Sequence, residues 1–413
     1  MLGREPQDFD IATDARPAQV EKLFKRTVPV GKKFGVMLVV EKKHQFQVAT
    51  FRAEGDYRDG RHPTKVAFAS AQADARRRDF TVNGLFYDPI SEKLHDWVGG
   101  EKDLRAKVIR TIGAPEERFA EDHLRLLRAV RFAAQLNFEI EPKTFAAVRS
   151  LALKIKLISA ERIREELVKL FQAPHAARGL VLLRDSGLLE QILPELAATI
   201  SCEQSPDYHP EGTVFQHIRL MLEKLPTGAD ESLPWAVILH DIAKPVTAAK
   251  DLKTGAIHFY GHEKVGAEMA HDILNRLRFP RKQIDEIVAC VRNHMQFKDV
   301  KLMRKSTLRR LLLRETFPLE LELHRLDCLG SHGGLDHYDF LMEQAKELEK
   351  KPAIRPPLLT GDDLMVLGMK PGPAMGALLR DVRERQLQDE LKTPRQARTW
   401  AKLKLREKPA AES

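Results

Sequence analysis

Signals for β-strands are confined to the first quarter of this chain, and the apolar residues that follow recur at helical spacing. Residues 33–40 and 45–52 are strand-forming runs joined by the polar residues 41–44, which predicts a hairpin. Residues 18–24 predict a short helix. Residues 53–63 are charged and contain glycine, which predicts a loop in which the strand pattern has ended. The chain is therefore predicted to be α+β, with a small mixed sheet followed by helical domains.

The length of the chain and its Pro-rich segments predict several domains. At 413 residues it exceeds one ordinary domain, and roughly two to four are expected. Residues 349–357, rich in Lys and Pro, predict a linker, and residues 374–405 predict one basic helix after it. The predicted parts are a mixed-sheet head, a helical neck and body, a histidine-rich helical domain, and a linker with a basic helical tail, at residues 1–110, 111–200, 201–348 and 349–413.

Composition excludes several classes of protein. No apolar run is long enough to cross a membrane, and no signal-peptide pattern is present at the start. The three cysteines, Cys202, Cys290 and Cys328, are far apart and form no Cys-x-x-Cys pair, which fits a reducing cytoplasm and excludes a thiolate zinc site. The formal net charge of +9 favours a polyanionic partner, with nucleic acid first, against a merely basic soluble protein.

Asp8 and Asp10 stand one residue apart in a segment expected to be extended, so both carboxylates point to one face of a strand. Two like charges so close require a counterion. Mg2+ prefers oxygen ligands, and two-ion nucleotidyl transfer uses such a pair of carboxylates. The alternative is a solvated strand edge, because an Asp-x-Asp pair occurs about once by chance in a chain of this length.

Two further polar sets have the chemistry of nucleotide binding. Arg78 could pair with phosphate bidentately, while Asp79 and Asn83 could bond ribose hydroxyls. The other set recurs in steps of three along an expected helix, at Asp122, Arg125, Arg128 and Arg131. An aspartate accepts from the amino group that cytosine and adenine carry, and an adjacent arginine donates to a ring acceptor. The alternatives are a capped helix start for the first set and an ordinary surface ion pair for the second.

The order of these motifs resembles that of the class II tRNA nucleotidyltransferases, the superfamily of bacterial CCA-adding enzymes and poly(A) polymerases. The likeness covers about the first 200 residues, through residues 2–11, 50–52, 59–63, 77–83, 96–104, 118–132 and 159–166. It implies a polymerase-β-like head in which Asp8 and Asp10 hold two Mg2+ ions. It also implies a mobile loop at residues 53–63 tied to the switch from C to A addition. The residues that it implies for nucleotide binding are Arg78, Asp122, Arg125, Arg128 and Arg131.

Two departures from the family pattern concern the head. The family places a Gly-Gly and a Val-Arg-Asp just before Leu2-Gly3, so we expect either a start assigned too late or a fragment with an incomplete head. Gln47 stands where the family has a third carboxylate. An amide cannot act as a base or add charge for a metal, so the primer hydroxyl would depend on metal activation and on Asp8 or Asp10.

Ten of the fifteen histidines lie between His209 and His337. Six residues there resemble, in order, the ligands of HD phosphohydrolase domains, which hold one or two metal ions: His217, His240, Asp241, His262, His294 and Asp327. Imidazole with carboxylate suits a transition metal better than Mg2+ alone. The alternative is a set of hydrogen-bonded core histidines, and hydrolysis of phosphate esters at RNA ends would be an additional activity.

The function that the sequence predicts is template-independent addition of nucleotides from CTP and ATP to the 3′ end of tRNA, with release of pyrophosphate. The alternatives within the enzyme class are a poly(A) polymerase acting on other RNA 3′ ends and an A-only or CC-only tRNA enzyme. Gly35 follows Phe34 where poly(A) polymerases usually carry a basic residue, which favours the tRNA enzyme. Alternatives of another kind are an inactive RNA-binding protein and a phosphohydrolase that uses only the histidine-rich domain.

Overall fold

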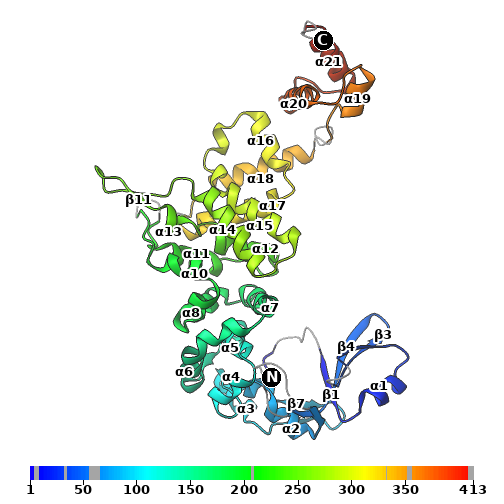
Figure 1. Cartoon of the computed structure of the whole chain (residues 1–413), viewed down its shortest axis with the longest axis vertical. Coiled ribbons are helices and arrows are strands. Elements are labelled where there is room, and N and C mark those ends of the chain that lie inside the picture. Colours follow the sequence, from blue (N-terminus) through cyan, green and yellow to red (C-terminus); the bar gives the residue numbers. More distant parts are fainter. Residues whose placement is uncertain are drawn as a thin grey trace. The chain divides into compact units, whose positions relative to one another are not determined.

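The structure is a computed structural model that describes residues 1–3, 9–31, 35–54, 66–205, 209–331, 333–350 and 356–407. It divides into two compact units (Figure 1). The first comprises Met1–Ala197 with Arg276–Phe279, and the second comprises Ala198–Asn275 with Pro280–Ser413. Within the described ranges, the one sheet of more than two strands lies in the first unit, so the predicted α+β class, a small sheet followed by helical domains, is confirmed.

The head is built on one four-stranded sheet. Its order is β1 (Asp10–Thr13), β4 (His44–Thr50), β3 (Val36–Glu41) and β2 (Thr27–Gly31). β1 is parallel to β4, whereas the β3–β4 and β2–β3 pairs are antiparallel, which confirms the predicted hairpin. The predicted short helix is α1 (Pro17–Leu23), whose Val20 packs with Met37, Val39 and Val48. One face of the sheet is thus covered by α1.

The strand pattern extends further than the sequence predicted. Arg52–Glu54 forms strand β5, which pairs antiparallel with β6 (Val66–Phe68). The prediction of a loop was therefore wrong for Ala53 and Glu54, because β6, more than ten residues later in the chain, supplies their backbone hydrogen-bond partners. Residues 55–65 lie outside the described residues, and so does most of the expected mobile loop.

The helical body of the first unit has the predicted apolar stripes. In α5 (Leu124–Leu136), the buried residues include Leu124, Leu127, Val130 and Ala134. In α7 (Ala160–Phe171), Ile163, Leu167 and Leu170 are buried. The two helices pack on each other and on α8 (Ala176–Asp185), where a side chain at Gly179 would meet Leu170 at 2.8 Å. The remaining helices of this body are α4 (Pro115–Glu121), α6 (Pro142–Leu151), α9 (Leu188–Ile192) and α10 (Pro194–Ala197).

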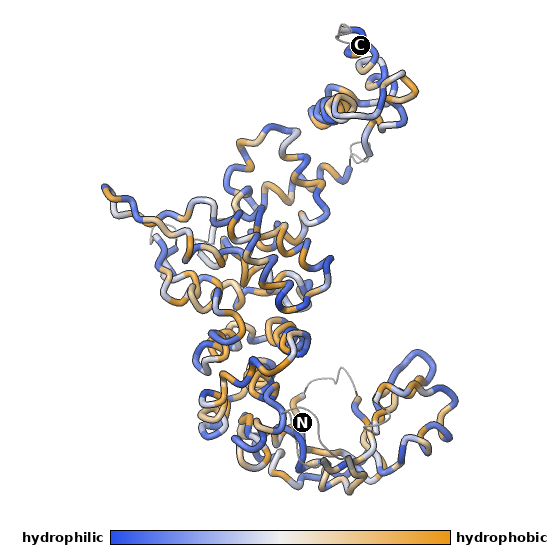
Figure 2. The backbone as a smooth tube through the Cα atoms, viewed as in Figure 1, coloured by the Kyte–Doolittle hydropathy of each residue, from blue (hydrophilic) through white to orange (hydrophobic). Residues whose placement is uncertain are grey.

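The second unit is a helical bundle around α12 (Ser232–Leu239), all of whose residues are buried. A helix that is apolar on every side must be enclosed by others. In Figure 2 the apolar stretches of the bundle lie largely where its helices face one another. Helices α11 (Val214–Glu223), α15 (Arg281–Asn293) and α17 (Phe317–Gly330) pack against α12. The bundle also contains α14 (His262–Arg276), α16 (Lys305–Leu312) and α18 (Asp336–Glu349). Among the described residues, no helix is long and apolar enough to cross a membrane.

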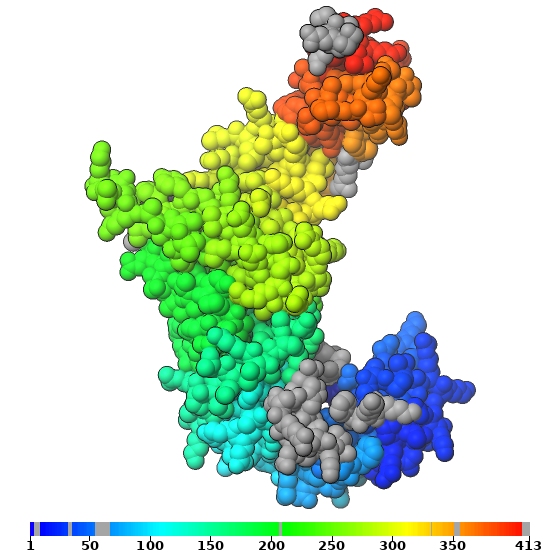
Figure 3. All heavy atoms as spheres, in the orientation of Figure 1, coloured from blue at the N-terminus to red at the C-terminus, as the bar shows by residue number. Residues whose placement is uncertain are grey.

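The tail differs from the single basic helix that was predicted. It folds as α19 (Gly361–Val366), α20 (Pro373–Leu387) and α21 (Pro394–Glu407), and it forms a compact lobe (Figure 3). The break follows from Asp389, whose φ of 66° is left-handed, and from Pro394, which starts the next helix. The three helices share a small apolar core, and Arg309 of α16 bonds Asp389 with two nitrogens at 2.7 and 3.0 Å.

Candidate functional site

Asp10 is the first residue of β1 and lies on the face of the sheet opposite to α1. Its Cα partner on the neighbouring strand is Gln47, and both side chains are exposed. Paired positions on adjacent strands point to the same side, so the amide of Gln47 lies beside the carboxylate of Asp10. Asp8, the other predicted metal ligand, lies outside the described residues.

Strand β5 is tied to α2 (Ala71–Arg77), which ends just before the first polar set begins at Arg78. The Arg52 N–H donates to Asp74 Oδ1 at 3.2 Å, and Arg77 Nε donates to the Arg52 carbonyl at 3.1 Å. Arg78, which caps α2, donates to Asp74 Oδ2 at 3.3 Å and to the Asn83 carbonyl at 2.9 Å. Its guanidinium also lies 4.5 Å from the centre of the Phe86 ring, so the position of Arg78 is fixed on three sides.

Asp79 is a buried acceptor that joins the two polar sets. Its carboxylate accepts from the Phe80 N–H at 2.9 Å, from Asn83 Nδ2 at 3.0 Å and from Arg128 Nε at 2.7 Å. Burial alone would raise the pKa of Asp79, but the Arg128 charge and the Asn83 hydrogen bond outweigh it and hold that pKa below its usual value. In this structure Asp79 therefore orients Arg128.

Arg125, Arg128 and Arg131, the arginine ridge, run along α5 as the spacing predicted. Glu166 of α7 faces two of them. Glu166 lies 2.5 Å from Arg131 Nε and 3.4 Å from Arg128 Nη1. Both guanidiniums also lie over the Phe132 ring, at 3.9 and 5.2 Å from its centre. Two neighbouring cations are thus held by one buried carboxylate and one aromatic face.

The predicted Asp122–Arg125 side-chain pair is not formed. Asp122 is not helical but caps α4 with extended backbone, and α5 begins only at Leu124. Its carboxylate bonds Arg162 of α7 at 2.6 and 3.2 Å, while Arg125 pairs with Glu121 and donates to the Arg118 carbonyl at 2.9 Å. The expectation of one continuous helix was wrong because this break separates the two residues.

Sequence reasoning therefore missed the residues that hold this cluster: Glu121, Arg162 and Glu166. A signal for two of them was available, because Arg162 and Glu166 are four residues apart and share one face of a helix. Their partners, however, come from other elements about 40 residues away, which local spacing does not indicate.

In the second unit the six predicted histidine and aspartate ligands gather in one cluster. Asp241 stands at its centre, with His240 Nε2 at 3.1 Å, His262 Nε2 at 3.4 Å and His294 Nε2 at 3.7 Å from its oxygens. His217 Nε2 lies 3.0 Å from Asp327 Oδ1. Two groups that share no residue each have ligand atoms within 4.8 Å of one another: His217, His240 and Asp327, and Asp241, His262 and His294. A third group, His209, Glu211 and His217, shares His217 with the first.

The hydrogen bonds of three histidines leave their Nε2 atoms facing this centre. The Nδ1 atoms of His240, His262 and His294 lie 2.8, 2.7 and 2.6 Å from backbone carbonyls three residues earlier, so each ring donates through Nδ1. If both rings are neutral, the Nε2 atoms of His262 and His294 each carry a lone pair, and these two lone pairs face each other at 3.1 Å. Among the residues that the structure describes, none forms a hydrogen bond with the buried Nε2 atom of His240. A cation resolves both conflicts, so the residues present fit a metal centre.

The structure adds three residues beside this cluster that the predicted ligand set did not contain. Glu211 Oε1 lies 2.6 Å from His217 Nδ1 and 2.9 Å from His209 Nδ1. Lys244 Nζ lies 2.7 Å from Asp241 Oδ2. The i, i+3 spacing from Asp241 could have indicated Lys244, whereas Glu211 precedes the helix of His217 and had no periodic signal.

The charges of the cluster are strongly coupled. Burial lowers the pKa of His217, but its hydrogen bonds to Asp327 and Glu211 outweigh burial and raise that pKa to about 9. Burial and the neighbouring His240 lower the pKa of His294 to about 3. Although burial opposes it, the His240 and Lys244 charges hold the pKa of Asp241 well below its usual value. The pKa values of these buried groups therefore depend on one another, as the effect of His240 on His294 shows.

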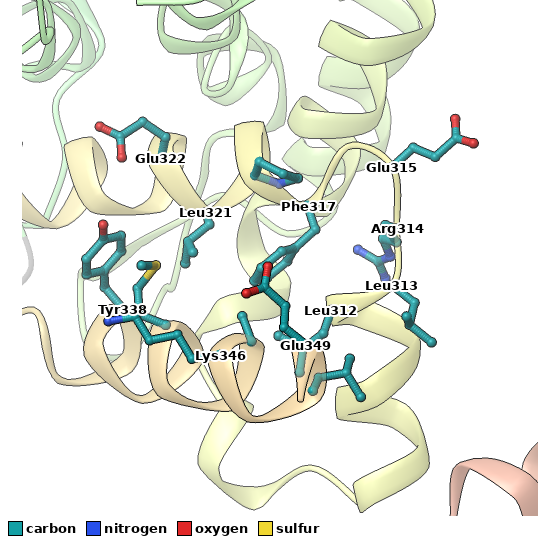
Figure 4. Close-up of a pocket in the computed structure, with 14 residues that line it drawn as sticks. Leu312, Leu313, Arg314, Glu315, Phe317, Leu321, Glu322, Tyr338, Lys346 and Glu349 are labelled. Atoms are coloured by element: carbon teal, nitrogen blue, oxygen red, sulfur yellow. The ribbon is translucent and has the colours of Figure 1, made fainter. Parts of the chain in front are cut away.

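A cavity of about 500 Å³ opens elsewhere in the bundle, between the end of α16, the first half of α17 and α18 (Figure 4). Phe317 and Leu321 come from α17, and Tyr338, Lys346 and Glu349 come from α18. None of the six predicted metal ligands lines it. The cavity is therefore separate from the histidine cluster.

Comparison with known proteins first defines the class. A family model described as the poly A polymerase head domain matches residues 1–110, and one described as "Probable RNA and SrmB- binding site of polymerase A" matches residues 137–200. A model of the HD domain matches residues 208–329. The sheet with its exposed Asp10, followed by the arginine ridge and the histidine cluster, therefore defines a nucleotidyltransferase with an HD domain.

Relatives then define the family. An A-adding tRNA nucleotidyltransferase of Deinococcus radiodurans is 36% identical over 353 residues, which cover 82% of this chain and 80% of that protein. A CCA-adding enzyme of Streptococcus pyogenes serotype M2 is 32% identical over 92% of this chain and 84% of its own length. The crystal structure of the Bacillus stearothermophilus CCA-adding enzyme in complex with CTP has a TM-score of 0.76, is 26% identical, and is matched over 98% of this chain and 90% of that one. The chain belongs to the tRNA nucleotidyltransferase family.

Proposed function

We propose that this chain adds nucleotides from CTP and ATP to the 3′ end of tRNA without a template. The observation that carries the proposal is the cluster in which arginines of α5 and α7 pair with Asp79, Asp122 and Glu166 in a chain of this family. The relatives that support it are named for CCA addition and for A addition, and one is solved with CTP. An Asp acceptor beside Arg donors suits the amino groups that cytosine and adenine share.

In the proposed reaction the 3′-hydroxyl oxygen of the RNA attacks the α-phosphorus, the bond to the bridging oxygen breaks, and pyrophosphate leaves. Arg78, Arg128 and Arg131 neutralise the triphosphate, and Asp122 with Arg125 contacts the base. Asp79 accepts a hydrogen bond from Asn83 and another from Arg128, and so holds both side chains in place. Two Mg2+ ions held by Asp8 and Asp10 would stabilise the attacking and leaving oxygens when bound. Gln47 beside Asp10 supplies no further negative charge to that pair.

The tail supports RNA binding in this proposal. Helix α21 exposes Arg395, Lys402 and Arg406. Basic side chains at the surface of a helix bind phosphates regardless of sequence, and helical RNA is recognised mainly through its backbone and shape. The acceptor arm of tRNA is the ligand that we assign to this face. We also propose a cytoplasmic location, which agrees with three free and buried cysteines.

A second candidate is an enzyme that adds only the terminal A. It is favoured by one specific observation, the 36% identity to an A-adding enzyme over most of both chains. Labelled CTP and ATP, offered in turn to tRNA that lacks its last three nucleotides and to tRNA that lacks only the terminal A, distinguish the two. A CCA-adding enzyme extends both RNAs, and an A-only enzyme extends only the second. Absence of incorporation into either RNA contradicts the proposal.

For the histidine cluster we propose binding of one or two divalent transition-metal ions, which His217, His240 and Asp327 on one side and Asp241, His262 and His294 on the other would hold. The support is the buried unpartnered Nε2 of His240 and the close approach of His262 to His294. Such a centre would supply an activated water for hydrolysis of phosphate esters at RNA ends when bound. Lys244, 2.7 Å from Asp241, offers a positive charge to a phosphate group.

A further inference from the structure

We propose that Arg162 is a positioning residue that fixes the Asp122 carboxylate and so sets the selection of the incoming base. The inference rests on the proposed function, because it assigns to Asp122 the contact with the base. The family resemblance implies no role for Arg162. Its role is indicated by the packing of α7 against the break between α4 and α5.

Asp122 sits at a point where the backbone does not fix its side chain. It is the residue that ends α4, its φ and ψ of −148° and 106° are extended, and the next helix starts two residues later. The only backbone group that bonds its carboxylate among the described residues is the Leu124 N–H, at 3.1 Å from Oδ1. One such bond leaves the carboxylate free to rotate about its own axis.

Arg162 removes that rotation. Its two terminal nitrogens donate to the two oxygens of Asp122, at 3.2 Å to Oδ1 and 2.6 Å to Oδ2. A planar guanidinium that bonds both oxygens holds the carboxylate in the plane of the fork. A carboxylate has about four acceptor sites, so with three occupied the remaining one points in a single direction.

Arg162 itself is held rigidly by the helix that carries it. The neighbouring Ile163 and Leu167 are buried, and Glu166 one turn later pairs with Arg128 and Arg131 of the ridge. The same helix thus sets the positions of the triphosphate-binding arginines and of the base acceptor. A carboxylate acceptor accepts from the amino group of cytosine or adenine but meets the carbonyl oxygen of uracil or guanine with repulsion. Its direction therefore determines how strongly the wrong bases are rejected.

The test compares Arg162→Gln and Arg162→Lys with Arg178→Gln in the full-length chain. Arg178 is a matched control, because it is similarly exposed and likewise bridges elements, donating to Asn137 Oδ1 at 2.7 Å and Glu139 Oε1 at 2.6 Å. KM, kcat and thermal stability are measured with tRNA that lacks the terminal A and each of the four nucleoside triphosphates.

For Arg162→Gln we expect the KM for ATP to rise on the order of tenfold with a smaller change in kcat, and the discrimination against UTP and GTP to fall by a similar factor. Arg162→Lys should recover part of that discrimination, because an ammonium bonds the carboxylate without the fork. A merely structural role would reduce incorporation of all four nucleotides equally.

Unchanged discrimination in a folded Arg162→Gln, equal to that of Arg178→Gln, overturns the inference. If Arg162→Gln does not fold, the same comparison made with Arg162→Lys decides it. Failure of the unmodified chain to incorporate any nucleotide would instead contradict the proposed function, so the two failures are distinguishable.

Discussion

The arginine cluster of the first unit and the histidine cluster of the second differ in how their closely spaced polar groups are paired. In the first, each cation has a carboxylate or carbonyl partner from another element, and the side chains of Arg78 and Arg128 are 31% exposed. In the second, the side chains of His240, Asp241 and His294 are no more than 3% exposed. There, two ring nitrogens approach within 3.1 Å, and another has no hydrogen-bond partner.

This difference indicates what each cluster is built to hold. A set of ion pairs that is satisfied in the free protein can exchange its partners for a triphosphate and release it after each reaction. A buried set whose nitrogens oppose one another gains stability only when a cation occupies it. The first is therefore suited to a substrate, and the second to a resident ion.

The largest expected effect concerns the exposed end of β1. Asp10→Ala should reduce nucleotide incorporation at least about a thousandfold, because a metal-binding carboxylate is lost from the transferring site. Thermal stability should be nearly unchanged, since the Asp10 side chain is exposed. Asp14→Ala, which changes the exposed residue just after the end of the same strand, is the control and should keep full activity. Equal activity of the two variants would remove Asp10 from the site.

The second prediction tests the contrast at the histidine cluster. Elemental analysis of the purified protein should find one or two transition-metal ions per chain, and His240→Ala should lose most of the metal because its Nε2 faces the cluster. His271→Ala, which changes a histidine whose side chain is 44% exposed, should retain the metal. A protein that contains no transition metal, with no change in melting temperature on His240→Ala, would contradict a resident ion.

A third prediction concerns stability in the arginine cluster. Glu166→Gln removes the charge that faces Arg128 and Arg131, so the free energy of unfolding should fall by about 3 kcal/mol. The neighbouring Glu165 side chain is 61% exposed, and Glu165→Gln should change the free energy of unfolding by less than about 0.5 kcal/mol. Denaturant titration of both variants measures the difference. Equal stabilities would mean that Glu166 does not hold the ridge.

The smallest expected effect is on RNA binding by the tail. Replacing Arg395 and Lys402 by Ala should weaken tRNA binding and reduce the slope of log Kd against log salt concentration by roughly 1 to 2, because two phosphate contacts are lost. A double Ala variant of Lys253 and Lys282, which are also exposed, serves as the control. A slope that is the same in both variants and in the unmodified chain would place RNA binding away from α21.

Local periodicity predicted much of this molecule. The buried stripe of α5 and the ridge of Arg125, Arg128 and Arg131 follow from helical spacing alone, and the β3–β4 hairpin follows from two strand-forming runs and a polar turn. The histidine cluster was predicted as a set of residues. The bonds of His240 and His294 to carbonyls three residues earlier join neighbouring turns at the ends of α12 and α15, whereas the partner of His262 lies in the turn before α14.

The features that the sequence did not predict depend on contacts between distant segments. Strand β5 forms because β6 supplies its partners, and Asp122 bonds Arg162 rather than Arg125 because the chain breaks between α4 and α5. The tail was predicted as one helix, since the composition is basic throughout, but Asp389 in a left-handed conformation and Pro394 divide it. No local pattern encodes which far residue will satisfy a given charge.

The most direct measurement concerns the amino group of the incoming base. With tRNA that lacks only its terminal A, kcat/KM is compared for ATP and for the purine nucleoside triphosphate in which hydrogen replaces the amino group. If the carboxylate and arginines of the neck select bases through that group, kcat/KM should fall about 10- to 100-fold for the analogue. Equal kcat/KM for the two nucleotides would contradict the account.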